Sequence, residues 1–321
     1  MKPVRAAVVG VGYLGKFHAE KYAGLADAEL VAVADADIGR AREIAAKHNA
    51  AAYSDYRELI GKVDAVSIVV PTNLHHVIAR DFLLAGVDVL VEKPITVTLQ
   101  EADDLVAVAQ QKNRILQVGH LERFNGAIVA LNGILNKPMF IESHRLAPFK
   151  DRGIEVDVIL DIMIHDIDII LNLVGAPVTS IHAVGVPVVS SQTNDIANVR
   201  LEFATGCIAN ITASRISVKE MRKIRIFQQD AYISIDYAAQ DIEVYRKMEL
   251  GDQYDTPQIM YDDIEIRQAD SLNEEIRSFV NAVRTRCAPA VPGEAGRDAL
   301  KIALEIVHQV EARKQGLPQT G

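Results

Sequence analysis

The sequence predicts an α/β protein of two domains: a doubly wound parallel sheet, then an α+β domain with a large, mostly antiparallel open sheet. In about the first 120 residues, short apolar runs alternate with helical patterns, as in a series of βαβ units. From Phe140 onward, apolar and polar residues alternate within several runs, as in antiparallel strands that bury one face. We place the domains at residues 1–121 and 122–321, and we allow for the C-terminal helix to pack back on the first domain.

The predicted strands of the first domain are almost wholly apolar, as parallel strands buried on both faces are. They cover Val4–Val9, Glu29–Ala34, Ala65–Val70, Val87–Val91 and Ile115–Val118. Helical patterns connect them, one ending near Tyr22 and others at Leu74–Ala85 and Leu99–Lys112. Ligands of such sheets bind at the carboxyl ends of the strands, so the residues that follow each strand are the first candidates for a site.

A glycine-rich turn follows the first strand and opens the first helix. The first glycine of such a turn permits tight bending, the second lets the backbone approach a pyrophosphate, and the third lets helix pack on strand. The positive end of the helix would meet the phosphates. The turn is a full G-x-G-x-x-G, so we predict a Rossmann domain that binds a dinucleotide. The predicted contacts are Gly10, Gly12, Tyr13, Leu14 and Gly15.

The second strand ends in Asp35, twenty residues beyond Gly15. A carboxylate at this place accepts hydrogen bonds from the adenosine ribose hydroxyls and repels a 2′-phosphate. Ala36 follows, where an arginine or serine would suit NADP. We therefore predict NAD as the cofactor, in preference to NADP.

The tripeptide Glu92-Lys93-Pro94 lies where another parallel strand ends. Pro94 disfavours helical backbone angles at Lys93, so the lysine is expected to be extended at the strand tip, beside the ligand crevice. A lysine could also end a strand for solubility alone. The other candidates that converge on the same edge of the sheet favour the functional interpretation.

Pro71 and Thr72 follow a further strand on the same side, and His75 comes at the start of the next helix. For His75 the alternatives are a contact to the cofactor and plain polar surface. The adjacent His76 would point in a different direction on a helix, so a metal-binding pair is not expected.

The second half predicts a long apolar helix at Val156–Val174 and then a series of strands. The strands are Val178–Val189, Ala197–Phe203, Cys207–Ser214, Ile224–Gln228, Ala231–Asp236, Ile242–Lys247 and one near Ile259–Ile266. Two helices, Ser271–Arg286 and Gly293–Gln315, close the chain, the first with Ser271 as N-cap and Glu274 completing a capping box. A broad sheet with a free face often serves oligomerisation, so we expect a homo-oligomer.

The long apolar helix carries one polar stripe, formed by Asp157, Asp161, His165, Asp168 and Asn172. Asp161 and His165 are one turn apart, and a carboxylate beside a histidine can fix its tautomer and raise its basicity. That pairing suits proton transfer. The alternatives are a face that simply meets solvent and a metal site, for which we see no convincing third ligand.

Composition and charge narrow the classes of function. The chain has 321 residues and a formal net charge of −9, which argues against general nucleic-acid binding. No long uncharged stretch predicts a membrane span, and the N-terminus enters a strand without a signal peptide. Cys207 and Cys287 have no metal or redox spacing, which suits a reducing cytoplasm. We expect a cytoplasmic protein without a bound metal.

Basic residues nevertheless cluster in two places. Charge runs in turns are usually only solvated, but both groups follow predicted strands that could border the crevice, and guanidinium groups suit phosphate. We therefore predict a phosphate-bearing substrate. The first group is Arg145, Lys150 and Arg152, and the second is Arg215, Lys219, Arg222, Lys223 and Arg225.

The whole chain resembles the Gfo/Idh/MocA (glucose–fructose oxidoreductase and inositol dehydrogenase) family. The motifs that agree in order and spacing are Gly10–Gly15 with His18, Pro71–His75, Ala85-Gly86 through Pro94, and Asp161–Asp168. The resemblance implies an N-terminal Rossmann domain, a C-terminal domain with an open sheet, dimers or tetramers formed through that sheet, and oxidation or reduction of sugar and cyclitol hydroxyls.

Carried to matching positions, the family's roles place Lys93 and His165 at the substrate hydroxyl, Asp161 beside them and Glu92 near the nicotinamide ribose. One departure is Met163, where the family helix usually has glycine. A bulkier side chain there could reshape the pocket or alter helix packing.

Two further segments, Gly119–Asn125 with Arg123 and Ile141–Phe149 with Arg145, look like the subgroup that oxidises UDP-N-acetylglucosamine at its 3-hydroxyl. In bacteria that product feeds amino-sugar synthesis for lipid A or surface polysaccharide. The predicted substrate contacts are Arg123, Arg145, Arg152, Asp161, His165 and Arg215. Alternatives are a dehydrogenase of a free sugar or cyclitol and, in another class, a non-catalytic dinucleotide sensor.

Overall fold

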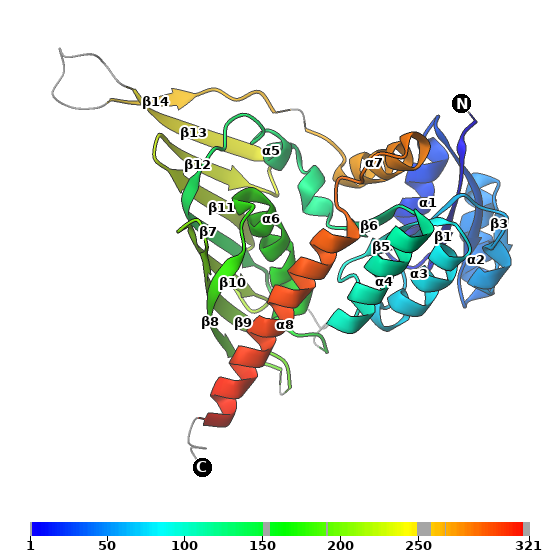
Figure 1. The fold of residues 1–321 in the computed structure, drawn as a ribbon, viewed down its shortest axis with the longest axis horizontal. Coiled ribbons are helices and arrows are strands. Elements are labelled where there is room, and N and C mark those ends of the chain that lie inside the picture. Colours follow the sequence, from blue (N-terminus) through cyan, green and yellow to red (C-terminus); the bar gives the residue numbers. More distant parts are fainter. Residues whose placement is uncertain (1, 150–154, 191, 249–257, 267, 317–321) are drawn as a thin grey trace. The chain divides into compact units, whose positions relative to one another are not determined.

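The chain contains two sheets of different kinds, one in each of its two units (Figure 1). The structure is a computed structural model and describes residues 2–149, 155–190, 192–248, 258–266 and 268–316. The first unit comprises residues 1–121 and 270–300, and the second comprises residues 122–269 and 301–321. The sequence analysis assigned residues 122–321 to one domain and allowed for the C-terminal helix to pack back on the first; in the structure, residues 270–300 group with the first unit.

The first unit contains a six-stranded parallel sheet in the order β3-β2-β1-β4-β5-β6. The chain winds outward from β1 to β3 and then resumes on the other side of β1, which is the doubly wound Rossmann order. The predicted fold is therefore confirmed. Five of the six strands were predicted, with ends that differ by up to two residues, and the short strand β3 was not predicted. The strands are β1 (Val4–Val9), β2 (Ala28–Ala34), β3 (Ala51–Tyr53), β4 (Ala65–Ile68), β5 (Asp88–Glu92) and β6 (Leu116–Gly119).

Helices connect these strands, and local capping explains where several of them begin. Thr98 and Glu101 form a reciprocal capping box at the start of α4, and Asn113 ends that helix in the left-handed conformation. Asp37 caps α2, which the sequence analysis had not predicted. The helices of this unit are α1 (Gly15–Gly24), α2 (Ile38–His48), α3 (His75–Leu84), α4 (Leu99–Lys112) and α7 (Ser271–Thr285).

Helix α7 lies far from α1 in the sequence and packs against it in the first unit. Ile276, Phe279 and Val280 are buried in the same core cluster as Tyr22 of α1. The N-cap of α7 is Asp270, whose carboxylate accepts hydrogen bonds from the backbone of Leu272 and Asn273, so the prediction of Ser271 was wrong by one residue.

The second unit contains an eight-stranded sheet in the order β14-β13-β12-β11-β7-β10-β9-β8. Only the β7–β10 pair is parallel among its strand pairs, so the predicted mostly antiparallel sheet is confirmed. The strands are β7 (Pro138–Leu146), β8 (Val178–Val186), β9 (Ile196–Phe203), β10 (Ile208–Ser214), β11 (Met221–Gln228), β12 (Ala231–Asp236), β13 (Asp241–Met248) and β14 (Gln258–Asp262).

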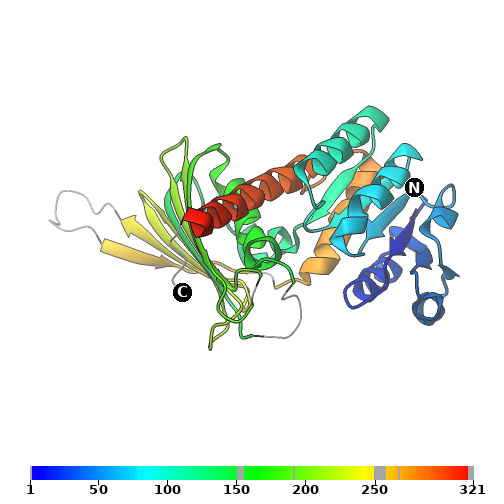
Figure 2. The ribbon, with the colours of Figure 1, turned by 90° about the horizontal axis from the view of Figure 1, so that it is seen from below.

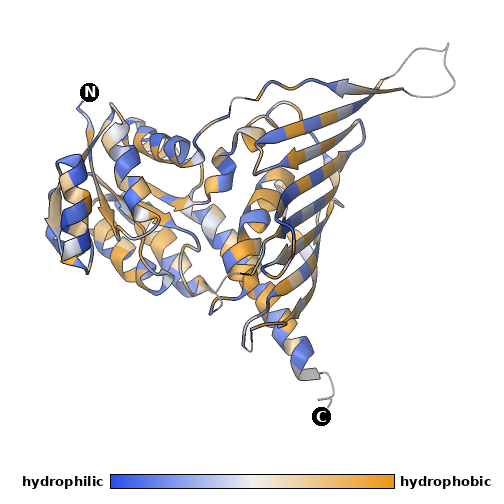
Figure 3. Cartoon of the chain, turned by 180° about the vertical axis from the view of Figure 1, so that it is seen from behind, coloured by the Kyte–Doolittle hydropathy of each residue, from blue (hydrophilic) through white to orange (hydrophobic). Residues whose placement is uncertain are grey.

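One face of this sheet is covered and the other is open. Helix α6 (Ile164–Val174) packs against β7 and β10, while no described helix lies on the opposite face (Figure 2). Colouring by hydropathy shows apolar and polar residues alternating along the strands, as a half-covered sheet requires (Figure 3). Residues 301–316 of α8 (Gly293–Gly316) also belong to this unit. Among the described residues, no helix combines the length and apolar character that crossing a membrane needs.

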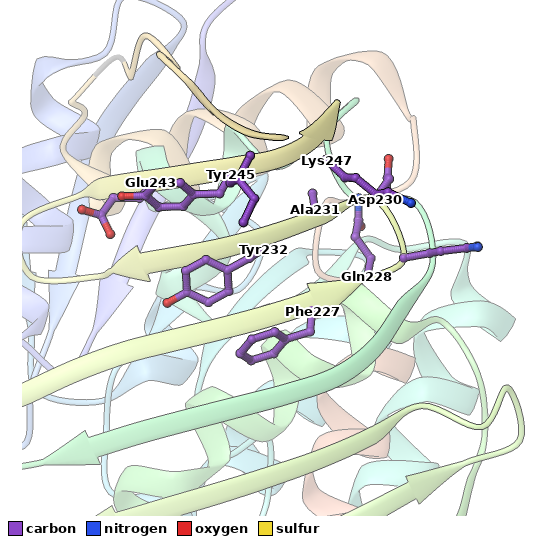
Figure 4. Close-up of a pocket in the computed structure, with 10 residues that line it drawn as sticks. Phe227, Gln228, Asp230, Ala231, Tyr232, Glu243, Tyr245 and Lys247 are labelled. Atoms are coloured by element: carbon purple, nitrogen blue, oxygen red, sulfur yellow. Dashed lines mark hydrogen bonds between the residues drawn. The ribbon is translucent and has the colours of Figure 1, made fainter. Parts of the chain in front are cut away.

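A row of aromatic side chains crosses the open face. Neighbouring rings of Phe140, Phe227, Tyr232, Tyr245 and Tyr261 lie 5.0–5.9 Å apart between centroids, each on the next strand. Three of these rings lie beside one another around an open depression of about 600 Å³ (Figure 4). Such cross-strand aromatic pairs stabilise sheets, and they also leave a continuous apolar stripe at the surface.

Candidate active site

The candidate cofactor site lies at the carboxyl edge of the first unit's parallel sheet. The glycine turn follows β1, Asp35 follows β2, Pro71 and Thr72 come after β4, and Lys93 follows β5. Because the strands are parallel, these segments emerge from the same edge of the sheet, at the place where open α/β sheets bind ligands.

The three glycines of the turn differ in what they make possible. A Cβ atom at Gly10 would lie 2.4 Å from the Val69 carbonyl oxygen, and one at Gly15 would lie 1.8 Å from the Gly10 oxygen. Both glycines are therefore required by the fold itself, and Gly10 also has a φ of 84°. A Cβ at Gly12 would meet no atom within 4 Å, so this backbone borders open space that a pyrophosphate could enter.

The start of α1 is suited to receive an anion. Its N-cap residue, Leu14, provides no side-chain cap, and the first turn holds no acidic residue. Backbone N–H groups at an uncapped helix N-terminus attract phosphate through hydrogen bonding and the helix dipole. Tyr13 and Leu14 are both exposed, with 66% and 36% of their surfaces accessible, so they border the same space.

Asp35 is held in place by the backbone around it. Its carboxylate accepts hydrogen bonds of 2.9 Å from the amides of Val11 and Asp37, and Arg40 Nη1 lies 3.4 Å from Oδ2. The bond to Val11 ties the carboxylate directly to the glycine turn. These residues fit a dinucleotide whose phosphates meet the turn and whose ribose meets Asp35.

The residues that follow β4 include both exposed and buried side chains. Pro71 is exposed and Thr72 partly so, which leaves both accessible to a ligand. His75, which the sequence offered as a cofactor contact, is only 1% exposed. Its ring nitrogens instead approach two backbone carbonyl oxygens, those of Pro94 and Val70, each at 2.9 Å.

Glu92 and Lys93 lie at the end of β5, and His18 of α1 interacts with this segment. His18 Nε2 is 3.2 Å from Glu92 Oε1, and the Lys93 amide donates to Glu92 Oε2 at 3.3 Å. Burial would raise the pKa of Glu92, but the hydrogen bond from His18 and the charges of His18 and Lys93 lower it overall. A Cβ at Gly119 would lie 2.9 Å from this carboxylate, so glycine at the end of β6 leaves room for it.

Glu275 is a buried acid that the sequence analysis did not single out. It lies on α7 with no exposed surface, and among the described residues its two carboxylate oxygens have no hydrogen-bond partner. Burial, together with the charge of Glu92, raises the pKa of Glu275 well above its usual range. No short-range pattern could have revealed this group, because α7 joins the first unit from the far end of the sequence.

The second unit carries the predicted acid–base pair on one helical segment. Asp161 lies within a π-helical turn, Ile159–Met163, and His165 lies at the second position of α6 directly after it. Both side chains are partly exposed. Single π-helical turns often occur at functional sites. Met163 is fully buried, so its side chain fills the core of the unit and is not at the surface.

Arg145, predicted as a substrate contact, is engaged by carboxylates of its own unit. Its Nε donates to Asp166 at 2.7 Å, its Nη1 donates to Glu122 at 2.8 Å, and its guanidinium lies over the Tyr237 ring. Burial alone would lower the pKa of Arg145, but the charges of Asp166 and Glu122 raise it overall. The sequence analysis did not single out Asp166 or Glu122, because each lies more than twenty residues from Arg145 and no local pattern predicts the pairing.

The remaining predicted basic contacts differ in their surroundings. Arg123 is held by Asp168 at 2.6 and 2.7 Å and by Asn172 at 2.6 Å, which accounts for two members of the predicted polar stripe. Arg215 is 6% exposed and donates to the carbonyl oxygen of Val156. Arg152 and Lys150 lie outside the described residues.

The described residues contain no group of three or more His, Cys, Asp or Glu side chains that could hold a metal ion. The described side chains of the two units offer two kinds of chemistry. The first unit offers a turn for a pyrophosphate and a carboxylate for a ribose. The second offers a carboxylate and an imidazole for moving a proton.

Family models match both units. The model of the oxidoreductase family with an NAD-binding Rossmann fold matches residues 4–120, and that of the GFO/IDH/MocA C-terminal domain matches residues 125–234. Together they cover more than half of the chain, and they agree with the fold of each unit.

Individual relatives are similar over nearly the whole length. A UDP-N-acetylglucosamine 3-dehydrogenase from Acidithiobacillus ferrooxidans is 38% identical, covering 96% of this chain and 98% of the relative. A solved structure of the enzyme of that name from the same organism superposes with a TM-score of 0.90, covering 97% of this chain and 99% of that one. A myo-inositol 2-dehydrogenase from Thermotoga maritima is 30% identical, covering 97% of each chain.

The family models match both units, and the named relatives are dehydrogenases. This chain therefore belongs to the Gfo/Idh/MocA oxidoreductase family and is a dehydrogenase with an NAD-binding Rossmann fold.

Proposed function

We propose that this protein uses NAD to oxidise the 3-hydroxyl of UDP-N-acetylglucosamine, in a pathway that supplies amino sugars for lipid A or surface polysaccharide. The observation that carries the proposal is the 38% identity, over nearly all of both chains, to a relative named for that reaction. The myo-inositol 2-dehydrogenase, at 30% identity, supports the alternative of a free cyclitol or sugar.

The choice of NAD over NADP is supported by the surroundings of Asp35. Its carboxylate is fixed by two backbone amides beside the glycine turn, so it would stand close to the adenosine ribose. A carboxylate there favours two free ribose hydroxyls and disfavours a 2′-phosphate. Arg40 lies close enough to neutralise part of the Asp35 charge, so it should reduce the size of the preference for NAD over NADP.

The proposed chemistry separates the hydride from the proton. When bound, NAD would supply the acceptor for the hydride that leaves the carbon bearing the hydroxyl. Lys93 and His165 are proposed to supply the acid–base chemistry at the hydroxyl, where one proton leaves, and Asp161 is proposed to orient the imidazole. Glu92 is proposed to lie at the nicotinamide ribose, because its carboxylate is held at the tip of β5 by His18 and the Lys93 amide.

A uridine diphosphate group would need cationic side chains that are accessible. Lys219 is exposed, and Arg222 is 44% exposed with only Glu220 as its ion-pair partner in the described residues. We therefore propose these two residues as the first contacts for the diphosphate. Arg123, Arg145, Arg152 and Arg215 stay as predicted substrate contacts, although the guanidinium groups of Arg123 and Arg145 are already paired within the second unit.

The test is NADH absorbance with purified protein, NAD and four candidates: UDP-N-acetylglucosamine, free N-acetylglucosamine, myo-inositol and scyllo-inositol. We expect turnover with the nucleotide sugar and competition by UDP alone. Turnover with an inositol but not the nucleotide sugar would support the cyclitol alternative. Tight NAD binding without any turnover in a wider screen of sugars would favour the dinucleotide sensor.

We further propose that a second copy of this chain covers the open face of the eight-stranded sheet, giving a dimer or tetramer. The aromatic row from Phe140 to Tyr261 is a continuous apolar stripe, and flanking ion pairs such as Arg225–Glu142 supply a polar border. Tyr232→Lys should lower the mass measured by light scattering, while Val129→Lys, on an exposed helix position of the same unit, should not. A monomeric wild-type protein would contradict this proposal.

A further inference from the structure

His75 has an arrangement that neither the glycine turn nor the acid–base pair explains. It is the first residue of α3, it is 1% exposed, and each of its two ring nitrogens is 2.9 Å from a backbone carbonyl oxygen. One of these carbonyls, Val70, lies five residues earlier in the same connection. The other, Pro94, is 19 residues away in sequence and directly follows Lys93.

The Pro94 contact therefore joins two segments of the carboxyl edge of the sheet. One is the connection after β4, which contains Pro71 and Thr72. The other is the segment after β5, which contains Lys93. Within the first unit, the ring of His75 links the start of α3 to the Lys93–Pro94 segment through this hydrogen-bond contact.

The carbonyl oxygens of Val70 and Pro94 both accept hydrogen bonds, and a neutral histidine ring has only one N–H to donate. Burial lowers the pKa of His75, against the opposing effects of the Val70 and Pro94 carbonyls and of the Glu92 charge, so the neutral ring is favoured. A neutral imidazole donates through only one nitrogen. Donation from Nδ1 ties α3 to the Lys93 segment, whereas donation from Nε2 closes only the local turn.

We propose that His75 is a positioning residue, whose Nδ1–H donates to the Pro94 carbonyl oxygen and thereby holds the backbone of Lys93 in its working position. The inference rests on the proposed function in one respect, the acid–base role of Lys93. It assigns to His75 no contact with cofactor or substrate.

Two conservative substitutions separate the two hydrogen bonds. The amide nitrogen of asparagine stands at the same number of bonds from Cβ as Nδ1, and that of glutamine at the same number as Nε2. His75→Asn therefore keeps a donor for Pro94, and His75→Gln keeps one for Val70. His76→Asn is the matched control, because His76 is the next residue of α3 and pairs with Asp104 on α4 at 2.8 Å.

Turnover should follow the Pro94 bond. We expect His75→Asn to stay within about threefold of wild type, and His75→Gln to lose roughly 10- to 100-fold, the range for a reacting group displaced by about 1 Å. His76→Asn should not change turnover. Equal losses in the two His75 variants, a larger loss in His75→Asn or no loss in either would overturn the assignment.

A double substitution tests whether His75 acts through Lys93. If it does, His75→Gln should cause little further loss in a Lys93→Ala background, because the group it positions is gone. The same 10- to 100-fold factor in that background would overturn the proposal. If Lys93→Ala alone keeps full turnover, the proposed role of Lys93 fails instead.

A measurement that does not depend on activity distinguishes failure of the His75 inference from failure of the proposed role of Lys93. The Lys93 amide should exchange its hydrogen faster in His75→Gln than in wild type or His75→Asn, whatever Lys93 does in catalysis. In the wild-type protein, nitrogen NMR of labelled histidine should show the His75 ring protonated at Nδ1. A ring protonated only at Nε2, or Lys93 exchange that is the same in every variant, would contradict the inference even if a variant were inactive through poor folding.

Discussion

We predict that the protein prefers NAD to NADP, and Asp35→Ser is the substitution that tests this prediction. The carboxylate of Asp35 is 9% exposed and accepts hydrogen bonds from Val11 and Asp37. Two unit charges at about 4 Å interact by about 1 kcal/mol in water and about 4 kcal/mol at an effective dielectric of about 20. A partly screened carboxylate beside a 2′-phosphate should therefore disfavour NADP by at least ~1.4 kcal/mol, or about tenfold.

Removing the carboxylate should change both affinities. NADPH binding should improve by the lost repulsion, with Arg40 then released to face the phosphate, while NADH binding should weaken by ~1.5–3 kcal/mol through lost charged hydrogen bonds. The ratio of the two affinities should move by roughly 100-fold or more. Adding Ala36→Arg should move it further in the same direction.

Fluorescence titration with NADH and NADPH measures both constants in one experiment. Asp37→Ser is the matched control, because it removes the same charge two residues away and serine can still cap α2. Equal affinity of the wild type for the two cofactors would refute the reasoning. So would a shift in Asp37→Ser as large as that in Asp35→Ser.

Three further predictions concern groups whose surroundings the structure defines. Arg145→Ala should destabilise the protein by about 3–5 kcal/mol in urea unfolding, because it leaves Asp166 buried and unpaired, whereas Arg225→Ala, at an exposed pair on the open face, should cost less than ~1 kcal/mol. Burial raises the pKa of Glu275, so the stability that this group contributes is present below its unfolded pKa of about 4.3 and is lost as the pH rises toward its folded pKa. In Glu275→Gln, the midpoint of urea unfolding should therefore fall less between about pH 5 and about pH 8 than in the wild type. The same fall in both proteins would contradict this prediction. Gly12→Ala should keep the melting temperature and weaken NAD binding, whereas Gly15→Ala should destabilise the fold itself; the reverse pattern in calorimetry would be inconsistent with the turn geometry.

Local patterns predicted much of the first unit because its signals are short in range. A strand, a glycine turn and a helix start occupy fewer than thirty residues, and the acidic end of β2 follows within the same βαβ unit. The strand tips after β4 and β5 could likewise be placed from apolar runs and prolines. What the sequence could not show is that His75 turns inward to Pro94, since that contact depends on how two loops lie against each other.

The second unit shows why tertiary partners limit such inference. The sequence analysis placed Arg145 after a strand but gave that strand no bounds, and Arg145 in fact lies within β7. The covered face of β7 carries Ser143 and Arg145, which break the apolar alternation. These side chains are tolerated there because Asp166 of α6 accepts hydrogen bonds from both. The sequence presents Arg145 only as a basic residue near a turn, so its predicted contact with phosphate took no account of this pairing.

Helix α7 and the π-helical turn illustrate two other limits. The apolar face of α7 predicts burial but not the partner, and the partner is α1 of the first unit. The π-helical turn Ile159–Met163 departs from regular α-helical spacing, and the composition of this segment does not predict that departure. Asp161 and His165 could still be singled out, because polar residues on an otherwise apolar helix stand out at any helical pitch.

The central claim is that hydride leaves C3 of UDP-N-acetylglucosamine for bound NAD, and isotope transfer tests it most directly. The protein is incubated with NAD and UDP-N-acetylglucosamine deuterated only at C3, and the NADH formed is analysed by mass spectrometry. The account predicts that the NADH carries the deuterium, and that Lys93→Ala forms it at a rate lower by roughly 10²–10⁴. Unlabelled NADH, or labelled NADH formed at the wild-type rate by Lys93→Ala, would contradict it.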